Sequence, residues 1–291
     1  MKNRWRLILP VLFLLVSASS TKGYSSGFGS LKDSKYTVVL IRSNDAALGT
    51  GFWYSSDNWA YLITAKRVIA GASSIQFFSY PQGYCENIPD EYSIDLATAA
   101  KNGCVISGSG DVVAVRIGKF VKVFQPLDGV TLTPPNFRNY FSQAGKRTTI
   151  TFSKAQNLGF DGFDCAEDIV LFGFPSPISR PAAPFQADKL DPNAPLFRKG
   201  VIAGKNTENG TFIIDGAANW SNSGCPVLLT RSGGAPAKEF FIIGVITEYI
   251  PYVSVSKYEN NRVTNITSAN TGNAVVEPIG AIIQLIENSE K

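Results

Sequence analysis

Histidine is absent from this sequence of 291 residues. Imidazole is the side chain most often used as a general base near neutral pH, and it is the commonest zinc ligand. Mechanisms that need a histidine base are therefore excluded. The cysteines do not form a zinc or thioredoxin-type motif either, because the chain has no C-x-x-C pair. We expect neither a metal nor a cofactor.

Charged residues are scarce as well, at 17% of the chain, whereas apolar residues make up 44%. Such a chain can bury enough surface to offset the entropy lost on folding, so we expect a globular protein. The formal net charge is +4. The first 20 residues contribute Lys2, Arg4 and Arg6 and no acidic side chain, which leaves +1 for the rest. This weak charge argues against nucleic acid as a partner.

Long hydrophobic runs are missing. The N-terminal apolar run, residues 7–16, has ten residues and contains Pro10, whereas a membrane-spanning helix needs roughly 18 or more. The run follows basic residues and precedes small ones, which predicts a signal peptide over residues 1–20. We expect a secreted or periplasmic protein without stable membrane insertion after signal removal. The alternative is an uncleaved membrane anchor.

The four cysteines are Cys85, Cys104, Cys165 and Cys225. An even number in an exported chain favours disulfides, although four cysteines allow three connectivities. We prefer a bridge between Cys85 and Cys104, which would close a short loop. Four buried, reduced thiols are the alternative.

Short runs typical of β-strands recur between turn signals along the chain and predict an all-β fold. They lie at 36–42, 51–55, 60–64, 74–79, 112–117, 148–152, 168–174, 198–203, 211–214, 226–230 and 240–246. Residues 31–125 and 147–291 are expected to form two β-barrels, with a connector at 126–146. The tail changes its period, because Ile279, Ile282, Ile283 and Ile286 follow helical spacing. This spacing predicts a C-terminal helix with one apolar face.

Three segments are informative when they are taken together. They read G-T-G-F-W from Gly49 with L-I-T-A-K-R-V-I from Leu62, then G-D-V-V-A-V from Gly110, then N-S-G-C-P-V-L from Asn222. In order and spacing the chain resembles the trypsin-like (chymotrypsin-fold) serine peptidases of the bacterial exported type. The resemblance implies two six-stranded-type barrels with a C-terminal helix, and an active site in the cleft between them.

The resemblance implies a site that has lost its base. Ser223 matches the family's nucleophile and Asp111 its orienting carboxylate, but Arg67 stands where the family has its histidine. Arginine stays protonated, with a pKa above about 12, and only donates hydrogen bonds, so it cannot act as the base. We expect Arg67 and Asp111 to form an ion pair instead.

The region that would stabilise an oxyanion also departs from the family. Ser221 and Cys225 replace glycines two residues before and two after Ser223, and Gly224 lies between them. Side chains there favour a different local backbone. Ala217 matches the floor of the family's substrate pocket. It implies a small uncharged pocket, unless it is simply a core alanine.

We interpret the protein as an inactive protease homologue that binds peptides or proteins. Strand addition beside residues 240–246 would supply the binding site. One alternative is an active endopeptidase or esterase that uses Ser223 with another base, such as Lys66, or with a supplied one. Another is an exported β protein whose loops carry its function. The ligand and the oligomeric state stay open.

Overall fold

The computed structural model describes residues 36–43, 46–80, 89–119, 129–130, 141–143, 149–174, 194–219, 222–232, 238–257 and 263–291. The expected signal peptide, Cys85 and Ser221 lie outside these residues. None of the helices in the described ranges is long and apolar enough to span a membrane.

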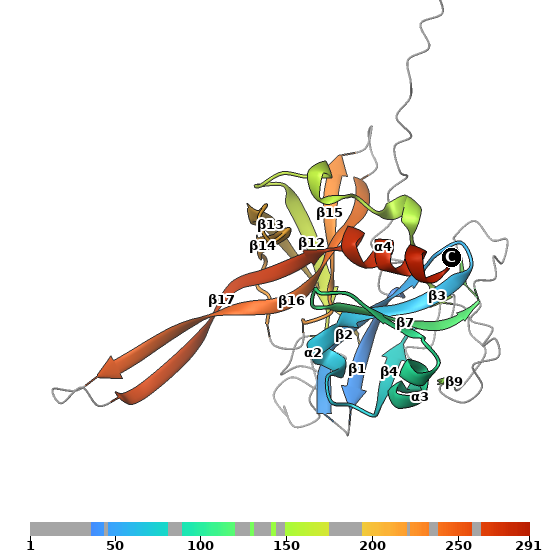
Figure 1. The fold of residues 1–291 in the computed structure, drawn as a ribbon. Coiled ribbons are helices and arrows are strands. Elements are labelled where there is room, and N and C mark those ends of the chain that lie inside the picture. Colours follow the sequence, from blue (N-terminus) through green and yellow to red (C-terminus); the bar gives the residue numbers. More distant parts are fainter. Residues whose placement is uncertain are drawn as a thin grey trace, which may run out of the picture.

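The N-terminal half is a curled sheet (Figure 1). Its strands run in the order β6-β7-β3-β2-β1-β4-β5-β9, and β11 pairs in parallel with β2. The bounds are β1 Val38–Ser43, β2 Ala46–Ser55, β3 Trp59–Ala65, β4 Ser74–Ser79, β5 Asp90–Asp95, β6 Val105–Ser107, β7 Val112–Lys119, β9 Phe141–Gln143 and β11 Phe152–Ser153. Two short helices, α2 Lys66–Ile69 and α3 Leu96–Lys101, connect its strands.

The C-terminal half is a closed barrel with the order β12-β13-β14-β17-β16-β15. The bounds are β12 Asp168–Gly173, β13 Leu196–Asn206, β14 Thr211–Asp215, β15 Pro226–Ser232, β16 Lys238–Lys257 and β17 Val263–Pro278. Inward-facing apolar side chains such as Phe212 and Ile243 fill it and are fully buried. The all-β two-barrel prediction is therefore confirmed.

The described residues of the expected connector, 129–130 and 141–143, form short strands. β8, Gly129–Val130, pairs with β10, Thr149–Ile150, and β9 joins the N-terminal sheet through β5. The single-turn helices η1 Lys154–Gln156 and η2 Phe160–Gly162 then lead to β12.

The C-terminal helix, α4 Ile279–Ser289, joins the two halves. The four isoleucines that predicted it are all buried in one cluster with residues of both halves, such as Phe52 and Leu228. After the helix, Glu290 accepts hydrogen bonds from Tyr61 and, at 2.6 Å, from Ser56. Both donors belong to the N-terminal half, so α4 locks the barrel to the first sheet (Figure 1).

The ends of β16 and β17 leave the barrel as a projecting two-stranded arm (Figure 1). The arm pairs Pro251 with Asn270 at its base and Lys257 with Val263 near its tip. Its apolar side chains Tyr252, Val253, Val255 and Ile266 are exposed.

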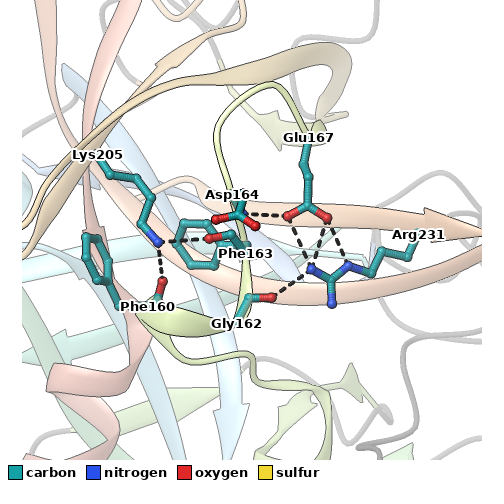
Figure 2. Close-up of polar contacts among 7 residues, drawn as sticks. All are labelled: Phe160, Gly162, Phe163, Asp164, Glu167, Lys205 and Arg231. Carbon is teal, nitrogen blue, oxygen red and sulfur yellow. Dashed lines mark hydrogen bonds and ion pairs between the residues drawn. The ribbon is translucent and has the colours of Figure 1, made fainter.

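A polar clasp holds the segment before β12 against the barrel (Figure 2). The Lys205 ammonium donates to the carbonyls of Phe160 and Phe163 at 2.7 and 2.8 Å. The Arg231 guanidinium pairs with the Glu167 carboxylate at 2.9 Å and donates to the Gly162 carbonyl at 2.7 Å. These bonds attach η2 to β13 and β15.

The disulfide prediction was wrong. Cys104, Cys165 and Cys225 are free thiols. Cys104 and Cys225 are buried, each with its Sγ near a backbone carbonyl oxygen, of Asn102 at 3.4 Å and of Phe172 at 2.7 Å. Thiols placed in this way behave as small core side chains. Cys165 is exposed, so the alternative of four buried thiols holds only for Cys104 and Cys225.

Candidate functional site

Strand register brings two of the three sequence motifs together. β3 pairs with β7 so that Ala65 lies opposite Val112. The residues just after β3 therefore meet the residue just before β7, and the Lys66 N–H donates to the Asp111 carbonyl at 2.6 Å. Arg67 and Asp111 thus belong to adjacent segments at one edge of the N-terminal sheet.

The Ser223 loop is attached to the same edge. The Thr50 N–H donates to the Ser223 carbonyl at 2.9 Å, and the Thr64 hydroxyl donates to the Thr50 carbonyl at 2.7 Å. A Cβ on Gly49 would lie 2.8 Å from the backbone carbonyl oxygen of Ser223 and 2.6 Å from the Val68 side chain. Gly49 is therefore needed because α2 and the Ser223 loop both lie against β2 at this position.

Gly224 holds the loop between the two halves. Its φ of +85° is in the left-handed region, and a Cβ there would overlap the Thr50 carbonyl oxygen. Its N–H donates to the Ile246 carbonyl at 2.7 Å, and the Ile246 N–H donates to the Cys225 carbonyl at 2.9 Å. The backbone of the N-S-G-C motif is thus tied to β2 on one side and to β16 on the other.

The side chains of Ser223, Arg67 and Asp111 are not joined by hydrogen bonds in the described part of the chain. Ser223 is partly buried, whereas Arg67 and Asp111 are exposed. The expected ion pair between Arg67 and Asp111 was wrong. Arg67 instead lies 3.9 Å from the Glu248 carboxylate, and both side chains are largely exposed, at 43% and 59%. An ion pair this long and exposed leaves the arginine accessible.

The Lys66 side chain, which was considered as an alternative base, is bound to a backbone carbonyl. Its ammonium donates to the Gly108 carbonyl at 2.6 Å. This bond directs the side chain toward the loop that precedes Asp111. Nothing in this geometry makes Lys66 a base for Ser223.

The sequence analysis did not identify Glu277 as a residue of the candidate site. Its carboxylate accepts the Asp111 N–H at 2.6 Å and fills the space that a Cβ on Gly110 would need. Burial raises the pKa of Glu277, and the nearby Asp111 charge adds to the rise, while the backbone N–H bond opposes it. Glu277 therefore holds the Asp111 turn in place from β17. Only the folded chain brings residues 111 and 277 together.

The turn around Ser223 uses several of its own amides. The Asn222 N–H donates to the backbone carbonyl of Asn219 at 3.0 Å, and the Cys225 N–H donates to the backbone carbonyl of Asn222 at 2.9 Å. Among the described residues, no acceptor binds the Ser223 N–H. Burial raises the pKa of the Cys225 thiol to about 12, so this cysteine is a core residue and not a nucleophile.

Ala217 is exposed, so the core-alanine alternative does not hold. Its φ of +49° is unusual for a residue with a side chain, and its carbonyl accepts a hydrogen bond from Arg198. The sequence analysis did not single out Arg198.

The expected strand-addition edge was wrong. Residues 240–245 of β16 pair with β15, and Gly244 to Ile246 pair with β17. The Ile242 carbonyl also accepts the Leu158 N–H at 3.1 Å. This stretch lies inside the closed barrel and cannot accept another strand.

A cavity of about 870 Å³ lies beside the site, between the Asp111 loop, β17 and the start of α4. Its lining includes Asp111, Glu248, Glu277 and Gly280 but not Ser223. Within the described residues, no group of three or more Cys, Asp or Glu side chains could hold a metal ion.

No protein-family model matches the chain, and no curated protein matches it. Among solved structures, a double mutant of human heparin binding protein matches with a TM-score of 0.50 and 9% identity, over 90% of this chain and 94% of that chain. The MamO protease domain from Magnetospirillum magneticum matches with a TM-score of 0.46 and 11% identity, over 87% and 96%. The HtrA-type protease AlgW with a decapeptide matches with 0.44 and 13%, over 87% and 63%. At 9% identity the likeness to heparin binding protein shows the fold alone, which is the chymotrypsin-like two-barrel fold.

Proposed function

We propose that the protein is a catalytically silent homologue of the trypsin-like peptidases that binds peptide or protein segments in the cleft beside Ser223. The observation that carries the proposal is the place of Arg67. It follows β3 beside Asp111, where the resembled family has its histidine, and its guanidinium faces Glu248. A group that is always protonated cannot take the serine proton.

The loss of the base has a large expected effect on turnover. Removing the histidine base of a serine-protease triad costs roughly 10⁶ in turnover, and what is left comes from oxyanion stabilisation and binding. Binding surfaces do not depend on the base. The loop backbone around Ser223 therefore supports retention of a cleft without retention of hydrolysis.

The binding edge that we propose begins at Thr247. The pairing of β15 with β16 ends at Val245, and in the described chain the strand that pairs with β16 from Glu248 to Lys257 is β17. An extended peptide could add to the other edge of β16 through its backbone. Glu248 lies at the start of this stretch, and Arg67 approaches its carboxylate from the N-terminal half.

Hydrolysis tests the absence of catalysis. The chain lacking residues 1–20 is compared with Ser223→Ala and Arg67→His, using casein cleavage and labelling by a serine-reactive fluorophosphonate. We expect the wild type to match Ser223→Ala, and Arg67→His to label at least about tenfold faster because it regains a base. Wild-type cleavage that Ser223→Ala abolishes would establish the active-hydrolase alternative and overturn the proposal.

Binding is tested with decapeptides selected from a random display library. Because alternate amides of an extended strand face opposite sides, N-methylation at two alternate positions should weaken binding by about tenfold, while methylation of the two intervening positions should not. The second peptide is the matched control. Equal effects of both patterns would contradict strand addition, and the absence of any selected binder would contradict the binding function.

A further inference from the structure

Arg198 occupies an unusual place for a charged residue. Along β13 the outward residues Phe197, Lys199 and Val201 are exposed, whereas Arg198 alternates with them and lies on the same side as the buried Ile202. The guanidinium is therefore partly buried on the inward side of a barrel strand. Charged side chains are rarely placed there unless they are paired.

Its neighbours are neutral oxygens. The guanidinium donates to the Ala217 carbonyl. With the Asn219 amide oriented so that its oxygen faces Arg198, that oxygen accepts from Nη1 at 2.9 Å and from Nη2 at 3.1 Å. Both acceptors belong to the short segment that leads to Ser223.

No carboxylate neutralises Arg198 within the described ranges. By contrast, Arg67 and Arg231 each face a glutamate. Burial lowers the pKa of Arg198, and the neighbouring Cys225 thiol, whose own pKa is raised to about 12, is neutral near pH 7 and gives no compensating charge there. A partly desolvated guanidinium with donors to spare is a site where an anion gains most, because carboxylates can bind the planar fork with two parallel hydrogen bonds.

The location connects this cation to the cleft. The bond to the Ala217 carbonyl attaches Arg198 to the turn whose next described residues, Asn222 to Cys225, carry the candidate nucleophile. The sequence pointed to a small uncharged pocket at Ala217. The fold adds a positive charge at that same residue, from a strand about twenty residues earlier in the chain.

We propose that Arg198 determines the ligand specificity of the cleft by binding a carboxylate of the peptide ligand, namely the side chain of Asp or Glu. This inference rests on the proposed binding function. A C-terminal carboxylate has the same chemistry, so the experiment separates the two sources.

The experiment measures binding of fluorescein-labelled decapeptide libraries by fluorescence polarisation. Each library fixes one position as Glu, Gln, Asp, Asn or Lys, with the C-terminus free or amidated. For the wild type we expect Glu and Asp to be preferred over Gln and Asn by about tenfold at one position, with no effect of amidation. The Glu-against-Gln comparison needs no variant protein.

Variants then assign the preference to Arg198. Arg198→Gln should abolish it, and Arg198→Lys should retain part of it. Lys199→Gln is the matched control, because Lys199 faces outward and pairs with Asp168 at 2.8 Å. Thermal unfolding checks that each variant is folded.

The outcomes separate the two proposals. If peptides bind with no acidic preference, or if the preference survives in Arg198→Gln, the role of Arg198 is overturned while peptide binding stands. If only amidation weakens binding, the carboxylate is that of the C-terminus and the side-chain assignment is wrong. If no library binds the wild type, the binding function fails and the inference with it.

Discussion

The two walls of the candidate site are held in different ways. The Ser223 loop is fixed by backbone hydrogen bonds to β2 and β16, through Thr50 and Ile246 at 2.7 to 2.9 Å. The opposite wall presents Arg67, whose side-chain contact is a 3.9 Å ion pair with Glu248. Backbone bonds persist whatever the side chains do, so the loop geometry can survive the loss of the chemistry that it resembles.

The largest effect is expected from the backbone-held wall. Gly224→Ala places a Cβ against the Thr50 carbonyl at a φ of +85°. It should lower the free energy of unfolding by about 3 kcal/mol or more. Urea titration monitored by tryptophan fluorescence measures this change. Gly204→Ala is the control, because nothing lies within 4 Å of its Cβ position; equal losses in the two variants would show that the loop is not specially constrained.

We expect an intermediate effect on stability when the coupling energies of two ion pairs are compared. Arg231 and Glu167 approach to 2.9 Å and share a network with the Gly162 carbonyl, whereas Arg67 and Glu248 are 3.9 Å apart and more exposed. Double-mutant cycles should give a coupling of about 1 kcal/mol for the first pair and less than about 0.5 kcal/mol for the second. A stronger coupling for the Arg67 pair would mean that this wall is as rigid as the loop, contrary to the comparison.

The smallest effect concerns Glu277, which supports the Asp111 turn. Its pKa is raised in the folded protein above the ordinary value of 4.5, so its protonated form favours folding. The contribution is fully present below about pH 4.5 and is lost as the pH rises through the raised pKa. Glu277→Gln keeps an acceptor and cannot ionise.

Between pH 4 and pH 7 the free energy of unfolding of the wild type should therefore fall relative to that of Glu277→Gln, by up to about 0.5 kcal/mol. The figure is small because the Glu277 side chain is half-exposed. Chemical denaturation at both pH values measures the difference. A wild type that gains on Glu277→Gln over the same interval would mean that hydrogen bonds to the carboxylate outweigh its burial.

Much of the strand framework could be predicted from local pattern. In the run at 74–79, Ile75 and Phe77 follow the pleat period of two, whereas 226–230 is a short continuous apolar run, and the structure has strands at both places. β17 was missed because V-T-N-I-T-S-A-N-T-G-N is polar and rich in asparagine, and its strand form comes from pairing with β14 and β16. β5 was missed because it begins with Asp90 and Glu91, which signal a turn in isolation.

The residues of the candidate site also fall into those that a local motif predicts and those that it does not. Arg67, Asp111 and Ser223 stood out because each lies in a short motif with glycine or β-branched neighbours. Glu248, Glu277 and Arg198 carried no motif. Their roles come from contacts to residues 19 to 181 positions away, which no local pattern encodes.

Residue type and spacing alone were enough to predict the all-β character, the apolar face of α4 and the absence of an imidazole base, because these properties are set locally along the chain. The tertiary structure decided which charges meet. In the folded chain Arg67 lies near Glu248, Cys104 is a free thiol and Arg198 donates to the Ala217 carbonyl. The physical reason is that electrostatic and hydrogen-bond partners are chosen by distance in space, which strand register and barrel closure set only after the chain has folded.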